Sequence, residues 1–119
     1  MTKGQIEAKI SEVVSKFEIE YMGRGPKQIK TMICEDTIII RLVRFLSPAE
    51  KSLSTLNDGA ELLKRFRYSL FELAKDRLKE MLEEIIGARI TNIYSDLNTT
   101  SGEKVIIVTL DRNYDKEIK

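Results

Sequence analysis

The chain contains no histidine and no tryptophan, and Cys34 is the one cysteine among its 119 residues. Without histidine it lacks the Ser-His-Asp and Cys-His arrangements of nucleophilic catalysis and the usual zinc-ligand sets. A single cysteine cannot form a disulfide within the chain. The residue types left for catalysis are carboxylates, lysine and tyrosine. The sequence therefore favours a binding protein that needs no cofactor over an enzyme.

Long hydrophobic runs and an excess of one charge are also absent. The apolar runs, that of residues 37–40 included, have the length of a strand and fall far short of the roughly 20 residues of a membrane helix. Residues 1–5 lack the apolar core of a signal peptide. The 20 basic side chains are balanced by 19 acidic ones, which argues against nucleic-acid binding through bulk charge. We expect one cytosolic domain, residues 1–119, that does not insert directly into a membrane.

The spacing of apolar residues predicts the first three elements. Residues 4–22 carry apolar side chains at helical spacing and are followed by Gly23, a typical helix end. Alternation over residues 28–33 and a β-branched run over residues 37–44 flank the turn Glu35-Asp36, which indicates a β-hairpin. One face of its second strand, with Ile39, Arg41 and Val43, is only partly apolar.

The second half of the chain predicts a short helix followed by a long one. Ser47-Pro48-Ala49-Glu50 is a typical helix start, and this helix should be short, ending near residues 53–56. A long helix then runs to Gly87, because apolar residues recur every three or four positions. They are Leu63, Phe66, Leu70, Leu73, Ala74, Leu78, Met81, Leu82 and Ile85.

Residues 89–95 and 104–110 predict a second β-hairpin around the polar loop 98–102, and the polar tail 113–119 should fray. The predicted fold is α+β, with a four-stranded antiparallel sheet built from two β-hairpins. An N-terminal helix and a long central helix pack on one face, in the order α-β-β-α-α-β-β.

The turn Gly23-Arg24-Gly25-Pro26-Lys27 is the first candidate site. Glycine lets a partner approach the backbone closely, and Arg24 and Lys27 supply positive charge, so the turn suits contact with an anion. It matches neither the phosphate-binding Walker loop nor the dinucleotide fingerprint. The alternative interpretation is a helix cap with a rigid exit and two solvated charges.

Two further clusters leave alternatives open. Asp96 and Asp111 lie near the ends of neighbouring predicted strands. If they come together, two carboxylates would suit a hard cation such as magnesium, or an enzyme that uses carboxylates or a metal. The alternative interpretation is that they are ordinary turn formers.

The basic run of Lys64, Arg65 and Arg67 has an aromatic neighbour, Phe66, as in nucleic-acid binding surfaces. Lys30, Arg41 and Arg44 would add to it if the first hairpin lay nearby. The simpler interpretation is a solvated helix face with Phe66 in the core.

Three blocks of sequence, in this order and spacing, resemble the MpsC-like family, which is named for a sodium-translocating, membrane-potential-generating system. The blocks are residues 23–30 (GRGPKQIK), residues 46–53 (LSPAEKSL), and Ser95-Asp96 leading into residues 100–113 (TSGEKVIIVTLDRN). The resemblance covers nearly the whole chain. It implies a soluble accessory of a membrane ion or bicarbonate transport system, and it brings no established active site or cofactor.

The polar residues of these blocks define the expected binding set for a partner or an anionic ligand. We expect the segment 111–113 to meet the glycine turn through an arginine–carboxylate network. The half-apolar sheet face and unpaired edge strands also predict a homodimer. The expected partners are thus a second copy and a membrane transport subunit or anionic ligand. The binding set is Gly23, Arg24, Gly25, Lys27, Asp96, Asp111, Arg112 and Asn113.

Overall fold

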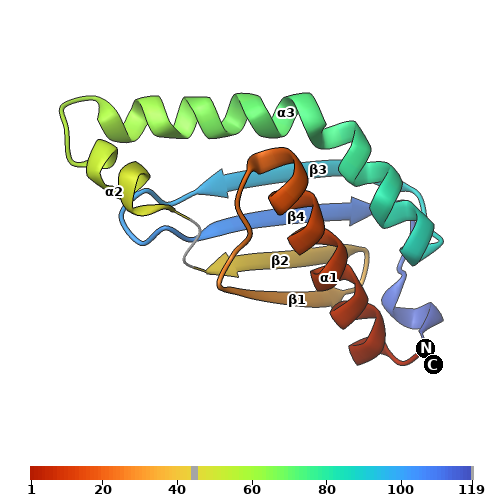
Figure 1. Cartoon of the computed structure of the whole chain (residues 1–119). Coiled ribbons are helices and arrows are strands. Elements are labelled where there is room, and N and C mark those ends of the chain that lie inside the picture. The colour runs from red at the N-terminus through yellow and green to blue at the C-terminus, as the bar shows by residue number, and fades with distance from the viewer. Residues whose placement is uncertain (44–45, 119) are drawn as a thin grey trace.

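The computed structural model describes residues 1–43 and 46–118, which form one antiparallel sheet with helices on one side (Figure 1). The predicted order α-β-β-α-α-β-β and the two β-hairpins are confirmed. A short 3-10 helix, η1, is added in the tail. The elements are α1 (Lys3–Met22), β1 (Gln28–Cys34), β2 (Thr37–Val43), α2 (Pro48–Ser54), α3 (Gly59–Ile86), β3 (Ile90–Leu97), β4 (Lys104–Leu110) and η1 (Asp115–Glu117).

Local hydrogen bonds explain where the first two helices begin and end. Thr2 and Gln5 form a capping box at the start of α1, and Gly23 ends this helix in the left-handed conformation with φ 85°. Ser47 and Glu50 form a second capping box at the start of α2. The cap and proline signals of the sequence therefore predicted the start of α2 correctly, and α1 begins at Lys3, one residue before the start expected from its apolar spacing.

The start of α3 depends on close packing. A side chain at Gly59 would place its Cβ 1.9 Å from the carbonyl oxygen of Leu53 in α2. Asp58, which precedes it, has a positive φ of 60° and makes no side-chain cap. Glycine is therefore required at position 59 by the tight turn between the two helices.

Within the described residues, none of the helices is long and apolar enough to cross a membrane.

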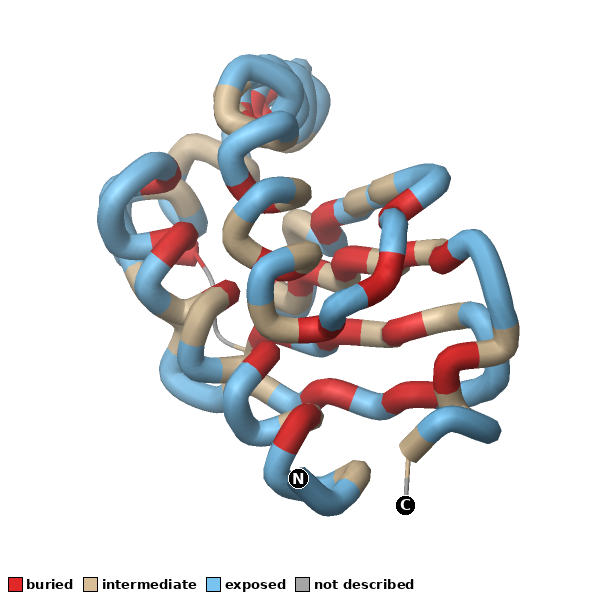
Figure 2. Tube along the Cα trace, turned by 90° about the vertical axis from the view of Figure 1, so that its right-hand side faces the viewer, coloured by how far each residue is buried: buried red, intermediate tan, exposed pale blue. Residues whose placement is uncertain are grey.

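The strand order is β1-β2-β4-β3, so β1 and β3 are the edges and the hairpins join through β2 and β4. Pairing in register aligns residues into rows across all four strands, such as Thr31, Ile40, Ile106 and Ser95. Successive rows face opposite sides of the sheet. Buried and less buried residues accordingly alternate along the strands (Figure 2).

The core lies between the sheet and the two long helices. Phe17 of α1 meets Phe71 of α3 edge to face, with ring centroids 6.1 Å apart. Among the described residues no helix covers the opposite face of the sheet, which remains partly apolar, as expected from the second strand.

Two predictions about packing were wrong. Phe66 and Leu73 of α3 are 57% and 84% exposed, because the buried stripe of this helix runs through Leu63, Arg67 and Phe71 instead.

The tail, which was expected to fray, packs against the domain. Tyr114 is buried, and Asp115 pairs with Lys3 at 3.0 Å. Lys119, the last residue of the predicted fraying tail, lies outside the described residues.

Candidate site at the loop end of the sheet

The sheet has two ends, and the expected binding residues divide between them. The loop end holds the start of β1, the end of β2, the end of β3 and the start of β4; the tail end holds the opposite strand termini. The turn 23–27 and Asp96 lie at the loop end. The segment 111–113 follows β4 and lies at the tail end, where Asp111 donates its backbone N–H to Arg89. The expected contact between the glycine turn and this segment is therefore wrong, because the two are separated by the length of the strands.

The same separation applies to Asp96 and Asp111. Asp96 pairs with Val105, and Asp111 comes after Leu110. At about 3.4 Å per residue, the two positions are about 17 Å or more apart along the sheet. They cannot share one cation, and no group of three or more carboxylate or cysteine side chains in the described residues is placed to hold a metal ion.

At the tail end, Arg112 has an evident structural role. Its guanidinium binds the carbonyl oxygen of Gly87, which ends α3, and the carboxylate of Glu117 in η1. It also contacts Asp111 at 3.2 Å. Asn113 accepts the backbone N–H of Lys116. These residues fasten the tail to the end of α3, where positive charge also favours the helix dipole.

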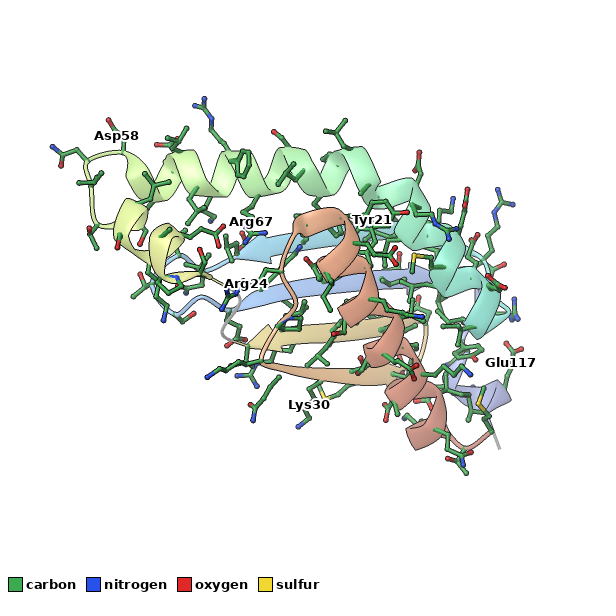
Figure 3. The ribbon with its side chains drawn as sticks, in the orientation of Figure 1. Tyr21, Arg24, Lys30, Asp58, Arg67 and Glu117 are labelled. Carbon is green, nitrogen blue, oxygen red and sulfur yellow. The ribbon has the colours of Figure 1, made fainter. Side chains whose placement is uncertain are left out.

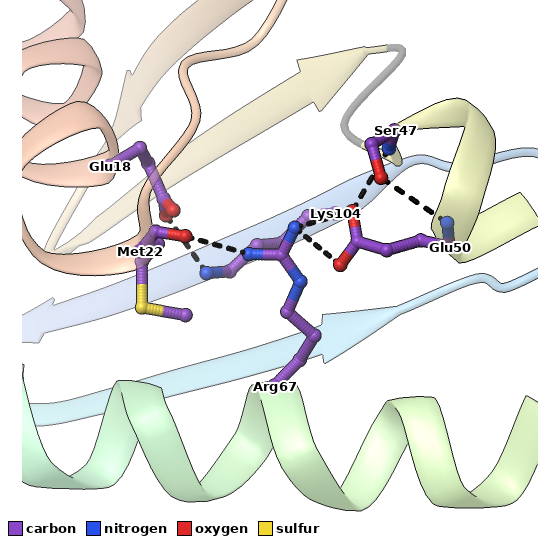
Figure 4. Close-up of polar contacts among 6 residues, drawn as sticks. All are labelled: Glu18, Met22, Ser47, Glu50, Arg67 and Lys104. Atoms are coloured by element: carbon purple, nitrogen blue, oxygen red, sulfur yellow. Dashed lines mark hydrogen bonds and ion pairs between the residues drawn. The ribbon is translucent and has the colours of Figure 1, made fainter.

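The loop end contains a buried ion pair that the sequence did not single out. Lys104 Nζ, at the start of β4, lies 2.8 Å from Glu18 Oε1 of α1, and both side chains are almost fully buried (Figure 4). The ammonium also lies 4.5 Å from the centroid of the Phe71 ring. The pair closes the core between α1, α3 and β4.

Burial acts on both partners against their charged forms. It raises the pKa of Glu18 although Lys104 opposes the shift, and it lowers the pKa of Lys104 although Glu18 opposes it. Glu18 Oε2 is buried and has no hydrogen-bond partner in the described part of the chain. The folded structure thus keeps Glu18 and Lys104 within hydrogen-bond distance in surroundings that favour the uncharged form of each side chain.

A second ion pair lies beside the first. Arg67 of α3 binds both carboxylate oxygens of Glu50, at 2.7 and 2.8 Å, and donates to the carbonyl oxygen of Met22 at 3.2 Å (Figure 4). Glu50 also accepts the backbone N–H of Ser47 at 2.9 Å. Arg67 therefore joins the C-terminal turn of α1 to the capping box of α2.

Glu50 is less deeply buried than Glu18, and its pKa moves the other way. Partial burial raises the pKa of Glu50, but hydrogen bonds from Arg67 and Ser47 outweigh this effect, and the pKa lies below its ordinary value. This carboxylate is consequently fixed in its charged form at neutral pH.

A cavity of about 300 Å³ opens beside these two ion pairs, between α3 and the end of β3. Buried Arg67 and Lys104 contribute to its wall, and Lys64 and Arg65 stand on its exposed side. Its one acidic side chain is Asp96, which pairs with Lys64 at 3.3 Å. The remaining lining residues are Tyr68, Ser95 and Leu97. Four cations and one carboxylate make the wall suitable for an oxyanion.

The glycine turn lies next to this arrangement, and its glycines have structural reasons. Gly23 caps α1, and a Cβ at Gly25 would lie 2.9 Å from the side chain of Ile19. Arg24 and Lys27 are exposed, and their side chains make no hydrogen bond or ion pair with the described residues, although the backbone N–H of Lys27 donates to the carbonyl oxygen of Val43 at 3.1 Å. Figure 3 shows Arg24 at the same end of the molecule as Arg67. The helix-cap interpretation of the turn is confirmed, and the anion contact stays a prediction.

The wider basic cluster expected from the sequence does not form. Lys30 and Arg41 project from the face of the sheet opposite the helices, and Arg41 pairs with Glu103 at 2.6 Å. Lys64, Arg65 and Arg67 belong to α3 on the other side. Arg44 lies outside the described residues. Arg67 is also no solvated charge, since it is 6% exposed.

A signal for the missed residues was present in the hydrophobic pattern. Arg67 stands midway between Leu63 and Phe71 at four-residue spacing, and Glu18 adjoins Phe17 on the buried side of α1. Lys104 is in phase with Ile106 and Val108. Three charges thus occupy core positions of three elements, and such charges are rarely buried without partners.

Comparison with known proteins gives a consistent family and no solved structure that matches. Two curated relatives come from Bacillus subtilis (strain 168). Uncharacterized protein YbcI is 32% identical over 118 residues, covering 99% of this chain and 95% of the relative. Uncharacterized protein YrhF is 26% identical over 110 residues, covering 92% and 90%. The family model described as "Na+-translocating membrane potential-generating system (MpsC)" matches residues 2–112, and the chain belongs to this family.

Proposed function

We propose that the protein is a non-catalytic binding protein that recognises an oxyanion, such as a carboxylate, bicarbonate or phosphate group, in the cavity beside Arg67 and Lys104. The observation that carries this proposal is the placement of two buried cations in the wall of a cavity whose exposed side holds Lys64 and Arg65. Charged hydrogen bonds from such groups are strong because little water competes for them.

The cations of the cavity wall differ in how firmly carboxylates of the same chain hold them. Arg67 and Lys104 are held by Glu50 and Glu18. Lys64 is held by exposed Asp96, and ion pairs between exposed groups are weak. An incoming oxyanion therefore needs to displace only one weakly held carboxylate to reach Lys64.

The family description supports a proposal about where in the cell this binding takes place. We propose a soluble cytosolic accessory of a membrane transport system, which reaches the membrane through a partner subunit. The exposed thiol of Cys34 suits a reducing compartment. Affinity purification with membranes retained should recover a membrane transport subunit; recovery of soluble proteins alone would remove this part of the proposal.

The binding proposal is tested by calorimetric titration with bicarbonate, phosphate and acetate at constant ionic strength, with chloride as the reference. Replacing both Lys64 and Arg65 by alanine should weaken binding about tenfold or more, as loss of charged hydrogen bonds predicts. The matched control replaces Arg77 and Lys79 of the same helix. Both double variants should melt within a few degrees of the wild type, because their side chains lie outside the core.

The source of the oxyanion is tested by a second titration with a short peptide rich in glutamate. Binding of the free anions would indicate a small-molecule ligand. Binding of the peptide alone would place the oxyanion on a partner protein. If no anion and no peptide binds, or if the Lys64 and Arg65 variant binds as well as the control, the proposal is wrong.

A further inference from the structure

The face of the sheet opposite the helices carries a continuous apolar row. Met32, Ile39, Ile107 and Tyr94 are neighbours in register across all four strands, and they share the side away from the core. Met32 and Tyr94 are 44% and 55% exposed, and the two isoleucines between them are half-buried. An apolar row that spans a whole sheet and is open to water favours a partner surface.

We infer that the occupant of this face is a second copy of the chain, packed sheet against sheet about a two-fold axis parallel to the strands. Such an axis lies between β2 and β4 and places β1 of one copy over β3 of the other. Each row of residues then lies opposite the same row of the second copy. Met32 therefore meets Tyr94 of the second copy, and Ile39 meets its Ile107. The apolar row thus forms a closed, isologous interface.

Charge complementarity selects this axis. The next row on this face is Lys30, Arg41, Val105 and Asp96, and its first and last members lie on the two edge strands. Within one copy Asp96 lies 3.3 Å from Lys64 of α3. Both of these side chains are exposed, so this ion pair is weak and Asp96 can exchange Lys64 for Lys30 of the second copy. The axis parallel to the strands brings Lys30 of each copy to Asp96 of the other, which makes two ion pairs. Lys30 makes no ion pair within its own copy among the described residues, and Figure 3 shows it pointing away from the helices. An axis perpendicular to the strands would instead set Lys30 against Cys34.

The size of the face is close to what a dimer needs. Four strands about 4.8 Å apart, with seven residues at about 3.4 Å each, give a footprint of about 450 Å² for each copy. Two footprints total about 900 Å² before the relief of the side chains is added, against roughly 1,200 Å² for a standard interface. Sheets packed face to face cross at about 30°, and the long lysine side chain can follow that rotation. We therefore expect a dimer of moderate affinity.

Charge exchange tests the pairing directly. Lys30→Asp and Asp96→Lys should each weaken the dimer at least about tenfold, because each makes two like-charge contacts at the interface. Asp96→Lys also meets Lys64 of its own copy, so the double variant is compared in a Lys64→Ala background. There it should return to within about threefold of the Lys64→Ala protein, since the ion pairs are re-formed in reverse. The measurement is sedimentation equilibrium of the full chain over a range of concentrations, with thermal melting to confirm that every variant folds. The control is Lys79→Asp on α3, which should leave the dimer unchanged.

Tyr94→Ser and Leu73→Ser test the position of the interface. Tyr94 lies on the apolar row, whereas Leu73 is a still more exposed apolar residue on α3. Tyr94→Ser should weaken the dimer about tenfold or more, and Leu73→Ser should leave it intact. A monomer at every concentration would overturn the inference. So would a dimer that is broken by Leu73→Ser and not by Tyr94→Ser, or a charge exchange that restores nothing.

Discussion

Glu18 Oε1 and Lys104 Nζ lie 2.8 Å apart although the two residues are 86 positions apart in the sequence. Beside this pair, Arg67 holds Glu50 and the end of α1. The two ion pairs connect α1, α2, α3 and β4 next to the cavity. Buried ion pairs seldom stabilise a fold more than apolar residues of the same size. Under the proposed function, these two pairs hold Arg67 and Lys104 in place beside the cavity.

The first prediction concerns the cost of breaking the buried pair. Lys104→Met leaves the Glu18 carboxyl buried without its partner and should lower the free energy of unfolding by about 3–5 kcal/mol. The combination Glu18→Leu with Lys104→Met should recover most of this loss. Urea unfolding of both variants measures the difference. A single substitution that costs under about 1 kcal/mol would show that water reaches Glu18.

The second prediction concerns pH and Glu50. Because its folded pKa lies below the ordinary value of 4.5, this carboxyl stabilises the fold above that pH, and the contribution is lost as the pH falls through the folded pKa. Glu50→Gln keeps an acceptor for the capping box and removes the charge that binds Arg67. The stability difference between wild type and variant should therefore shrink from about pH 6 to about pH 3. A difference independent of pH would contradict the ion pair.

The third prediction compares two glycines. Gly59→Ala forces a Cβ against the carbonyl oxygen of Leu53 and should cost at least about 2 kcal/mol, because backbone must move. Gly4, within α1, has nothing within 4 Å of the position of a Cβ. Gly4→Ala should raise stability by up to about 1 kcal/mol through helix propensity. Thermal unfolding of the two variants should thus shift in opposite directions.

The fourth prediction concerns the docked tail. Tyr114 is 7% exposed, and Tyr114→Ala should lower the free energy of unfolding by about 2–4 kcal/mol. Lys116→Ala, two residues later on the exposed side, should change it by less than about 0.5 kcal/mol. If both substitutions are silent in denaturant unfolding, the tail does not contribute to the folded core.

Local signals in the sequence predicted the elements well. Ser47, Pro48 and Glu50 set the start of α2, and Gly23 and Gly87 end their helices, because caps depend on neighbouring residues alone. The strand order could not be deduced in the same way. It depends on β2 and β4 pairing across more than 60 positions, and only this pairing reveals that residues 111–113 lie far from the glycine turn.

The candidate site was predicted only in part. The glycine turn and Asp96 do lie at one end of the sheet, and Glu50 contributes to the same end through Arg67. The run of charge with its neighbours Lys64 and Arg65 predicts a solvated position for Arg67, which is instead buried. The helical phase placed it in the core, and recognising this from sequence would have required weighing phase above local composition.

Oxyanion binding is tested most directly by amide NMR spectra recorded while bicarbonate or phosphate is added at constant ionic strength. Binding at the cavity should shift the amide signals of Lys64, Ser95, Leu97 and Lys104 in a saturable way. The Lys64→Ala and Arg65→Ala double variant should need an anion concentration about tenfold higher or more for the same shifts. Signals at the tail end, such as those of Asp111 and Arg112, should stay in place. Saturable shifts confined to the tail end, or none at all with either anion, would contradict an oxyanion site beside Arg67 and Lys104.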